Sequence, residues 1–419
     1  MTPYQITVDQ DILHQLFIGT DRDAGVARLL ETVLNQVLTA QATDQLAAQT
    51  YERTSERKGY RNGSYERDVI TRAGSVTLRV PRFRDGSFST ELFARYQRSE
   101  QALVLSLMEM VINGVSTRKV TKITEELCGT QFSKSTVSHL CKQLDPAVHD
   151  WNNRSLADHA FPFITIDAIY VKVREEGRIC SRGVLVGYGV NEQGRREILG
   201  LRVDDTESEE SWGAYFRWLK ERGLHGVELV TSDYHGGLVK AIEKEFQGVS
   251  WQRCQTHFIK NVLNAAPKAL QSEIKSRVRS IFDAPDMKTA RSYLEQTLEA
   301  YAETAPKAMK ILEDGFEDAV AVLAFPEAYR VRLRTSNGME RLNGEIRRRE
   351  TVIRIFPNRA SVLRLIGAML MEENEYWMTK KPYMDMTDFK AWKKQKATQG
   401  AGSEEQETST TMTEATDSL

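Results

Sequence analysis

The chain has 419 residues, of which 41% are hydrophobic and 27% are charged, and its formal net charge is −1 at pH 7. This length exceeds what one hydrophobic core usually supports, so two or three domains are expected. The apolar runs are strand-sized, the first residues lack the pattern of a signal peptide, and the four cysteines have no CxxC spacing, so we expect a cytoplasmic protein with reduced thiols, without a membrane span or a four-cysteine zinc module.

Charge is distributed unevenly along the chain. Residues 400–419 carry five acids and no base, whereas the region from Arg53 to Arg84 holds nine Lys/Arg against three Asp/Glu. Residues 396–419 contain almost no large apolar side chains and are predicted to form a disordered acidic tail. The distribution of charge, rather than its sum, therefore bears on function.

Residues 1–50 are predicted to form a helical N-terminal segment. Apolar side chains recur at spacings of three and four from Val26 to Leu38, which makes an amphipathic stripe that needs a partner surface. Two partners fit this stripe equally well: the chain's own core, or a second subunit in a dimer.

Residues 51–95 are predicted to form basic β-hairpins, because turn signals alternate with short β-branched and aromatic segments. The turn signals are Asn62-Gly63, Ala73-Gly74 and Asp85-Gly86. The concentration of basic side chains favours a surface that follows DNA phosphates over an ordinary solvated ribbon. The candidate phosphate contacts are Arg57, Lys58, Arg61, Arg67, Arg82 and Arg84.

Residues 96–150 are predicted to contain a helix-turn-helix. Ser116 can cap a first helix, Gly129 breaks it, and Ser133 can cap a second helix whose first turn is small and polar. A helix pair that serves packing alone is the alternative, and the neighbouring basic hairpins favour DNA binding. The candidate contacts are Arg118, Lys119, Ser133, Lys134, Ser135 and Thr136.

The remainder of the chain predicts an α/β domain. Residues 151–260 show three strand-like segments followed by helix, strand, helix and strand, which is typical of a mixed sheet that starts with an antiparallel meander. Residues 261–333 are helical in pattern and are predicted to form an insertion. Residues 334–395 are predicted to supply the final helices of this domain.

Two aspartates in this domain are candidates for metal binding. Asp167 lies in the middle of the apolar strand FITIDAIYV, where an ionised carboxylate is costly unless it is paired or binds a metal. Asp233 ends the next-but-two strand, VELVTSD, and ligands gather at strand ends in open α/β sheets. Each aspartate has a structural alternative. Asp167 could lie at the margin of the sheet and pair with a basic side chain, and Asp233 could be a cap or turn residue.

A third acid would complete a two-metal site for phosphoryl transfer, because hard divalent cations prefer oxygen ligands. The charged helix that starts near Ser336 offers Glu340, Glu345 and Glu350. With a cap near Ser336, Glu340 falls in the first turn and shares a face with Asn343, whereas Glu345 points about 140° away. Spacing alone prefers Glu340 modestly and leaves Glu345 as the competing choice.

Five blocks of this chain resemble, in order, the bacterial Mutator-type insertion-sequence transposases. They are GYRNGSYERDVITRAGSVTLRVPRFRDGSF, FITIDAIYVKV, LVTSDYHGGLVKAI, WQRCQTHFIKNV and TSNGMERLNGEIRRRETVIRIFPN. The resemblance implies a ribonuclease H-like catalytic domain with a helical insertion before the last acid. It implies an Asp-Asp-Glu (DDE) triad of Asp167, Asp233 and Glu340 that binds two Mg²⁺ ions, with Mn²⁺ able to substitute.

The same resemblance suggests roles around the triad. Cys254, His257 and Asn343 are expected to support the active site; two soft ligands are too few for a structural zinc. Four arginines of the last block are expected to grip the DNA backbone: Arg341, Arg347, Arg348 and Arg349.

The function expected from these features is DNA transposition. A homodimer would hold two terminal inverted-repeat ends, cut them, and join them to target DNA, by a copy-out route through a circular intermediate, in the nucleoid of a bacterial cytoplasm. The alternatives are a non-catalytic helix-turn-helix regulator derived from a transposase, and a ribonuclease H-like nuclease without strand transfer.

Overall fold

The computed structural model describes residues 5–18, 22–71, 73–90, 92, 101–128, 132–396 and 398. The predicted turn residue Gly129 and all but the start of the predicted acidic tail lie outside these residues. The chain forms two compact units, Met1–Gln143 and Leu144–Leu419. None of the helices in the described part of the chain combines the length and apolarity needed to span a bilayer.

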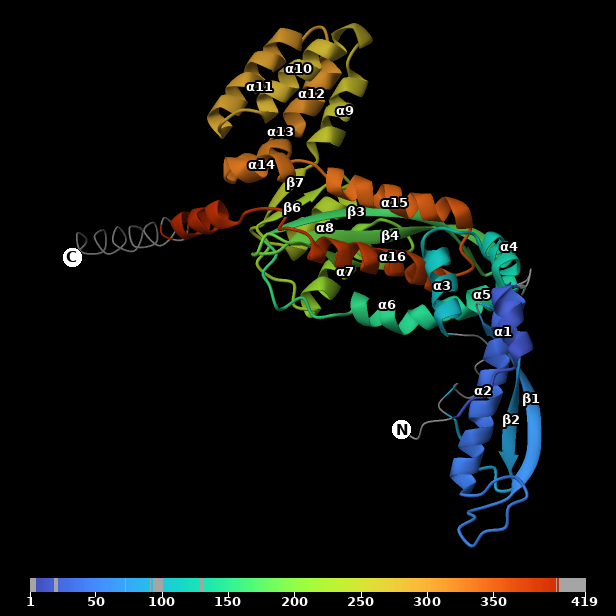
Figure 1. Ribbon diagram of the computed structural model, residues 1–419. Coiled ribbons are helices and arrows are strands. Elements are labelled where there is room, and N and C mark those ends of the chain that lie inside the picture. Colours follow the sequence, from blue (N-terminus) through green and yellow to red (C-terminus); the bar gives the residue numbers. More distant parts are fainter. Residues whose placement is uncertain are drawn as a thin grey trace, which may run out of the picture. The chain divides into compact units, whose positions relative to one another are not determined.

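The first unit begins with two helices and one hairpin. Helices α1 (Gln10–Phe17) and α2 (Arg22–Leu46) precede the antiparallel strands β1 (Arg61–Thr71) and β2 (Gly74–Phe83), and α2 packs along the hairpin (Figure 1). The stripe on α2 supplies Leu38, which is buried with Val76 and Leu78 of β2. The chain's own core therefore takes up this part of the predicted stripe.

Among its described residues, the basic segment forms one hairpin, whereas its turn signals predict several. Asn62-Gly63 lies inside β1, where the pairing register shifts between Arg61 and Ser64. Gly63 has φ +73°, a left-handed conformation that glycine adopts without strain, so this dipeptide makes a bulge and not a turn. Gly74 starts β2 after the true hairpin turn.

Three short helices complete the first unit: α3 (Gln101–Ile112), α4 (Thr117–Cys128) and α5 (Lys134–Cys141). Ser133 caps α5, since its Oγ accepts a hydrogen bond of 3.1 Å from the backbone N–H of Thr136. Val120 of α4 and Val137 of α5 are fully buried, and the three helices contact one another. The apolar faces of the predicted helix pair therefore form a small core.

The second unit is built on a five-stranded mixed sheet. Its strands are β3 (Phe163–Glu175), β4 (Arg178–Val190), β5 (Arg196–Asp204), β6 (Leu229–Ser232) and β7 (Ser250–Arg253). The order is β5-β4-β3-β6-β7, in which β3, β4 and β5 form an antiparallel meander and β6 and β7 continue in parallel from β3. The predicted mixed α/β sheet is confirmed.

Helices cover both faces of this sheet, and strand alternation decides which residues each face receives. Ile164 and Ile166 of β3 pack with Trp212 of α7 (Glu209–Glu221) and with α8 (Gly236–Glu245). The odd-numbered residues of β3 point the other way, toward α15 (Asn337–Ile353). Two further helices pack on β5: α6 (Asp145–Asn152) and α16 (Arg359–Thr379).

A helical insertion separates β7 from α15 and has its own core, centred on Phe258, Val278 and Leu312 (yellow to orange in Figure 1). Its helices are α9 (Gln255–Ala265), α10 (Gln271–Phe282), α11 (Met287–Tyr301), α12 (Pro306–Asp314), α13 (Phe316–Val320) and α14 (Glu327–Leu333). Pro306 occupies the first turn of α12, where its missing N–H costs nothing.

Candidate active site

Asp167 and Asp233 are brought together by strand register. The parallel pairing of β3 with β6 matches Thr165 with Thr231, and each aspartate lies two residues further along its own strand direction. Asp167 is still within β3, whereas Asp233 directly follows β6. The period of two therefore places both carboxylates on the sheet face that α15 covers.

Burial and a neighbouring acid perturb the ionisation of Asp167. Burial raises the pKa of its carboxyl, the charge of Asp233 raises it further, and Glu207 adds to the same effect, so the pKa reaches about 7. Two hydrogen bonds act in the opposite direction: the N–H of Ala168 donates to Oδ1 at 2.8 Å, and Asn343 Nδ2 donates to Oδ2 at 2.6 Å. Desolvation and like-charge repulsion outweigh these bonds.

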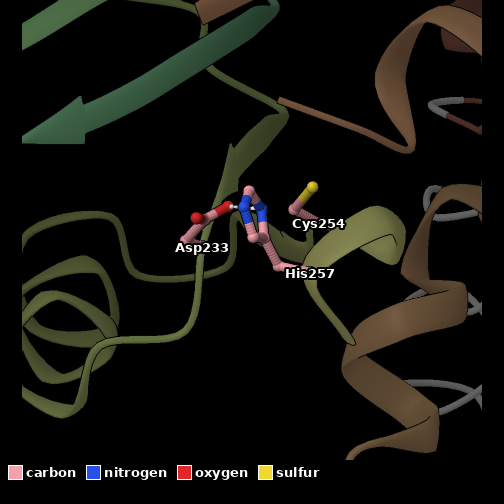
Figure 2. A group of neighbouring side chains, drawn as sticks. All are labelled: Asp233, Cys254 and His257. Atoms are coloured by element: carbon pink, nitrogen blue, oxygen red, sulfur yellow. Dashed lines mark ion pairs between the residues drawn. The ribbon is translucent and has the colours of Figure 1, made fainter. Parts of the chain in front are cut away.

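Helix α15 contributes Glu340 from its first turn and Asn343 three residues later on the same face. His257 of α9 lies between this helix and Asp233: its Nδ1 is 2.8 Å from Asp233 Oδ1, and its Nε2 is 3.6 Å from Glu340 Oε1. Figure 2 shows the imidazole facing Asp233. Asp233 and Glu340 thus meet at His257, and Asn343 links the helix of Glu340 to Asp167.

Ser336 is a site residue as well as the N-cap residue of α15. It occupies the cap position that the sequence predicts, but its side chain makes no capping hydrogen bond. Its Oγ lies 3.1 Å from Asp233 Oδ1 and 3.2 Å from Cys254 Sγ, and its backbone N–H donates to that sulfur at 3.3 Å. The buried Cys254 therefore connects the start of α15 to the end of β7.

Glu207 is an acid near the site that sequence reasoning missed. Its Oε1 accepts a hydrogen bond of 3.2 Å from Nε1 of the fully buried Trp212 and lies 3.6 Å from His235 Nδ1. Trp212 thus anchors the core of α7 and also holds a carboxylate that acts on Asp167. A single acid in the polar run before α7 carries no signal in the sequence that would mark it.

Two sets of possible metal ligands share Asp233. The first is the predicted set of carboxylates, Asp167, Asp233 and Glu340, which do not all come within 4.8 Å of one another. In the second, one ligand atom from each of Asp233, Cys254 and His257 lies within 4.8 Å of the others (Figure 2). The sulfur in the second set is already an acceptor for Ser336. The all-oxygen set suits Mg²⁺ or Mn²⁺, and the mixed set has the chemistry of a zinc site.

Glu345 is placed differently from Glu340. Its Oε2 lies 2.7 Å from Arg349 Nη1 and 3.0 Å from Arg348 Nη2, and these contacts lower its pKa. Arg349 is buried against the helix, whereas Arg341, Arg347 and Arg348 are exposed. The structure thus brings Glu340, and not Glu345, to His257.

The candidate DNA contacts of the first unit differ in their exposure and in their hydrogen bonds within the protein. Arg57 donates to the backbone oxygens of Gly59 and Glu52, and Arg61 donates to Thr43 Oγ1 at 2.7 Å. Burial, followed by the charge of Arg57, lowers the pKa of Arg61. Arg57 therefore stabilises the segment before β1, and Arg61 joins β1 to α2.

The other candidates of the first unit are mostly at the surface. Arg67 is half-buried, and Arg82 lies over the ring of Tyr65 at 4.8 Å. The exposed candidates are Lys58, Arg82, Arg84, Arg118, Lys119, Ser133, Lys134, Ser135 and Thr136.

Comparison with known proteins assigns the family. Residues 1–380 match the family model described as "Transposase, Mutator family". This chain belongs to the Mutator family of transposases. The transposase for insertion sequence element IS256 in transposon Tn4001 of Staphylococcus aureus is 45% identical over 380 residues, which cover 90% of this chain and 97% of that protein. The transposase for ISRM5 of Rhizobium meliloti is 43% identical, with coverage of 88% and 93%.

Among solved structures, the Drosophila P element transposase strand transfer complex matches 72% of this chain and 84% of its own chain, with 11% identity and a TM-score of 0.31. That likeness is too distant to inform the fold. The family match confirms the resemblance that the five sequence blocks carry.

Proposed function

We propose that this Mutator-family transposase cleaves and joins DNA at the terminal inverted repeats of an insertion sequence, with Asp167, Asp233 and Glu340 as its catalytic triad. The observation that carries the proposal is the convergence of these acids from β3, the end of β6 and α15, linked through His257 and Asn343. Its insertion-sequence relatives support the reaction class.

The proposal includes a ribonuclease H-like catalytic domain. The strand order β5-β4-β3-β6-β7, with an antiparallel meander followed by two parallel strands, supports it, as does the position of the helical insertion between β7 and α15. We assign DNA recognition to the hairpin of residues 51–95 and to a helix-turn-helix within residues 96–150. A homodimer that holds two ends, association with the bacterial nucleoid and a circular intermediate belong to the same proposal.

The residues present fit a pair of Mg²⁺ ions, with Mn²⁺ able to substitute. Asn343 Oδ1 is buried and has no hydrogen-bond partner among the described residues. Burial and the charge of Asp233 raise the pKa of Asp167 to about 7, and a divalent cation would favour its ionised form. Asp167, Asp233 and Glu340 would hold the ions, which supply Lewis-acid stabilisation of charge on the attacking and leaving oxygens of the phosphodiester.

The chain's own groups prepare this site. Asn343 orients Asp167 through its 2.6 Å hydrogen bond, and Ser336 and His257 fix Asp233 from two sides. Arg341 and Arg347 are exposed on the helix that carries Glu340, so they are the α15 arginines that we assign to DNA phosphates; Arg349 is committed to Glu345. In this proposal the scaffold contributes to the rate by positioning the scissile phosphate.

The test is strand transfer by purified protein with labelled inverted-repeat ends and Mg²⁺. Glu340→Gln is expected to reduce the rates of cleavage and joining by at least about 100-fold, because it removes a charged ligand while keeping the shape of the side chain. Glu345→Gln is the matched control on the same helix and is expected to retain activity, although loss of the partner of buried Arg349 costs about 1–3 kcal/mol of stability.

Three outcomes contradict the proposal in different ways. Full joining activity in Glu340→Gln, with none in a folded Glu345→Gln, would reverse the choice of the third acid. Cleavage without joining would identify a nuclease, and DNA binding without cleavage would identify a regulator.

A further inference from the structure

A cleft in the helical insertion opens beside the candidate active site. It has a volume of about 540 Å³ and lies between α9, α10 and the segment that leads into α15. At one end it begins at Gln255 and Thr335, the residues next to Cys254 and Ser336. Two residues of the cleft lining are therefore direct chain neighbours of two residues that lie at Asp233.

Two helix faces form the walls of this cleft. From α9 it receives Thr256, Ile259, Lys260 and Leu263, which recur at spacings of three and four, while His257 between them points to Asp233. From α10 it receives Lys275, Arg279 and Phe282 at the same kind of spacing. The walls thus combine an apolar floor with a basic rim.

The rim is available for an anionic ligand. Lys260, Lys275 and Arg279 are exposed, and no ion pair joins any of them to another described residue. The cleft's fourth base, Arg334, is 2.6 Å from its single acid, Asp283. The lining therefore carries three unneutralised positive charges.

Charge is also unevenly distributed along the sequence of the insertion. Residues 255–282, which form α9 and α10, contain five Lys/Arg and one Asp/Glu, whereas residues 284–320 contain eight Asp/Glu and four Lys/Arg. The helices that line the cleft are therefore basic overall, which favours a polyanion there, whereas the helices that follow them in the chain are acidic overall.

We propose that this cleft binds the DNA strand where it passes the active site, with phosphates on Lys260, Lys275 and Arg279 and a base against Ile259, Leu263 and Phe282. The assignment rests on the proposed transposase function, because it takes the DNA at Asp233 as its starting point. The volume lies within the range of about 300–1,000 Å³ that accepts ligands larger than a single small group. Exposed cations that contact phosphates release counterions, and aromatic side chains such as Phe282 stack on base faces without regard to sequence.

The test uses the full chain without divalent metal, so that it measures binding and does not depend on cleavage. The variant Lys260→Gln/Lys275→Gln/Arg279→Gln is compared with Lys268→Gln/Lys288→Gln/Lys307→Gln, which removes the same charge from exposed positions of the insertion outside the cleft. The probe is a fluorescein-labelled inverted-repeat duplex with a single-stranded extension at the cleavage point, followed by anisotropy from 50 to 300 mM NaCl.

Each lost phosphate contact lowers the slope of log K against log salt by about 0.7–0.9. We expect the cleft variant to lose about 2 from the magnitude of this slope and the control variant to keep the wild-type slope. Equal slopes for wild type and the cleft variant, with both variants folded by circular dichroism, would overturn the proposal. A reduced slope in a protein that neither cleaves nor joins DNA would preserve the cleft assignment while the proposed catalytic function fails.

A crosslink identifies the occupant. p-Benzoylphenylalanine in place of Leu263 is expected to crosslink to the extension strand on irradiation, whereas the same substitution at the exposed Tyr293 of α11 is not. If the cleft took a free mononucleotide instead, titration with ATP would give saturable binding that the cleft variant lacks, with no change in the salt slope. That result would overturn the DNA assignment.

Discussion

The ionisation of Asp167 gives a stability prediction that needs no DNA. Its pKa is raised from an ordinary value of 3.8 to about 7 by burial and by Asp233. The folded state therefore binds the proton more tightly than the unfolded state. The contribution of Asp167 to the free energy of unfolding is therefore highest below the unfolded pKa. It falls by about 1.4 kcal/mol for each pH unit as pH rises toward 7, and it is constant above pH 7.

Asp167→Asn removes this dependence. Between pH 5 and pH 7 the wild type loses about 1.4 kcal/mol of stability for each of two pH units, and the variant does not. The free energy of unfolding of the variant, relative to that of the wild type, should therefore increase by roughly 3 kcal/mol as pH rises from 5 to 8. Asparagine keeps the acceptor for the N–H of Ala168 but presents an N–H to Asn343, which costs about 1–2 kcal/mol at every pH. The variant should therefore be about as stable as the wild type at pH 5 and more stable at pH 8.

The assay is urea unfolding in EDTA at pH 5, 6, 7 and 8, followed by tryptophan fluorescence. All six tryptophans lie between Trp151 and Trp392, so the signal reports the second unit alone. Asp158→Asn, at an exposed position of the same unit, is the matched control. A difference between Asp167→Asn and wild type that stays constant from pH 5 to pH 8 would refute the reasoning.

Two further substitutions test how α15 is positioned. Gly338→Ala places a Cβ 2.5 Å from Tyr188 Oη, so the first turn of α15 must move with Glu340; we expect at least a 10-fold loss of strand transfer, whereas Gly344→Ala, with open space at its Cβ, should keep activity and add about 0.5–1 kcal/mol of stability. Ser336→Ala removes the hydroxyl that contacts Asp233 and Cys254, so urea unfolding should show a loss of about 1 kcal/mol; unchanged stability together with unchanged strand transfer would show that these contacts contribute nothing.

Local sequence patterns predicted most elements of the second unit, because strand alternation and helical periodicity are set by nearby residues. The run FITIDAIYV became β3, and the apolar face of α7 became core, since both patterns bury their hydrophobic side chains in only one way. In the first unit, Asn62-Gly63 does not form the turn that this dipeptide predicts. The same dipeptide serves a turn or a bulge, and only the pairing of β1 with β2 distinguishes them.

The candidate site was predicted in part. The types and order of its acids are a property of the sequence, and the family pattern assigned them to a triad. What the sequence could not supply was the direction of each side chain across elements distant in the chain. Ser336 illustrates this limit: its position before a helix predicted a cap, but its side chain instead faces Asp233, 103 residues earlier.

The sequence by itself determined the strand and helix segments, the chain order of Asp167, Asp233 and Glu340, and the charge division within the insertion. Tertiary structure decided that β6 lies in parallel register beside β3, that α15 turns Glu340 toward His257 and Glu345 toward Arg349, and that two helix faces enclose a basic cleft beside them. The physical reason is that periodicity depends on neighbouring residues, whereas meeting of side chains depends on the packing of elements that only the folded chain brings together.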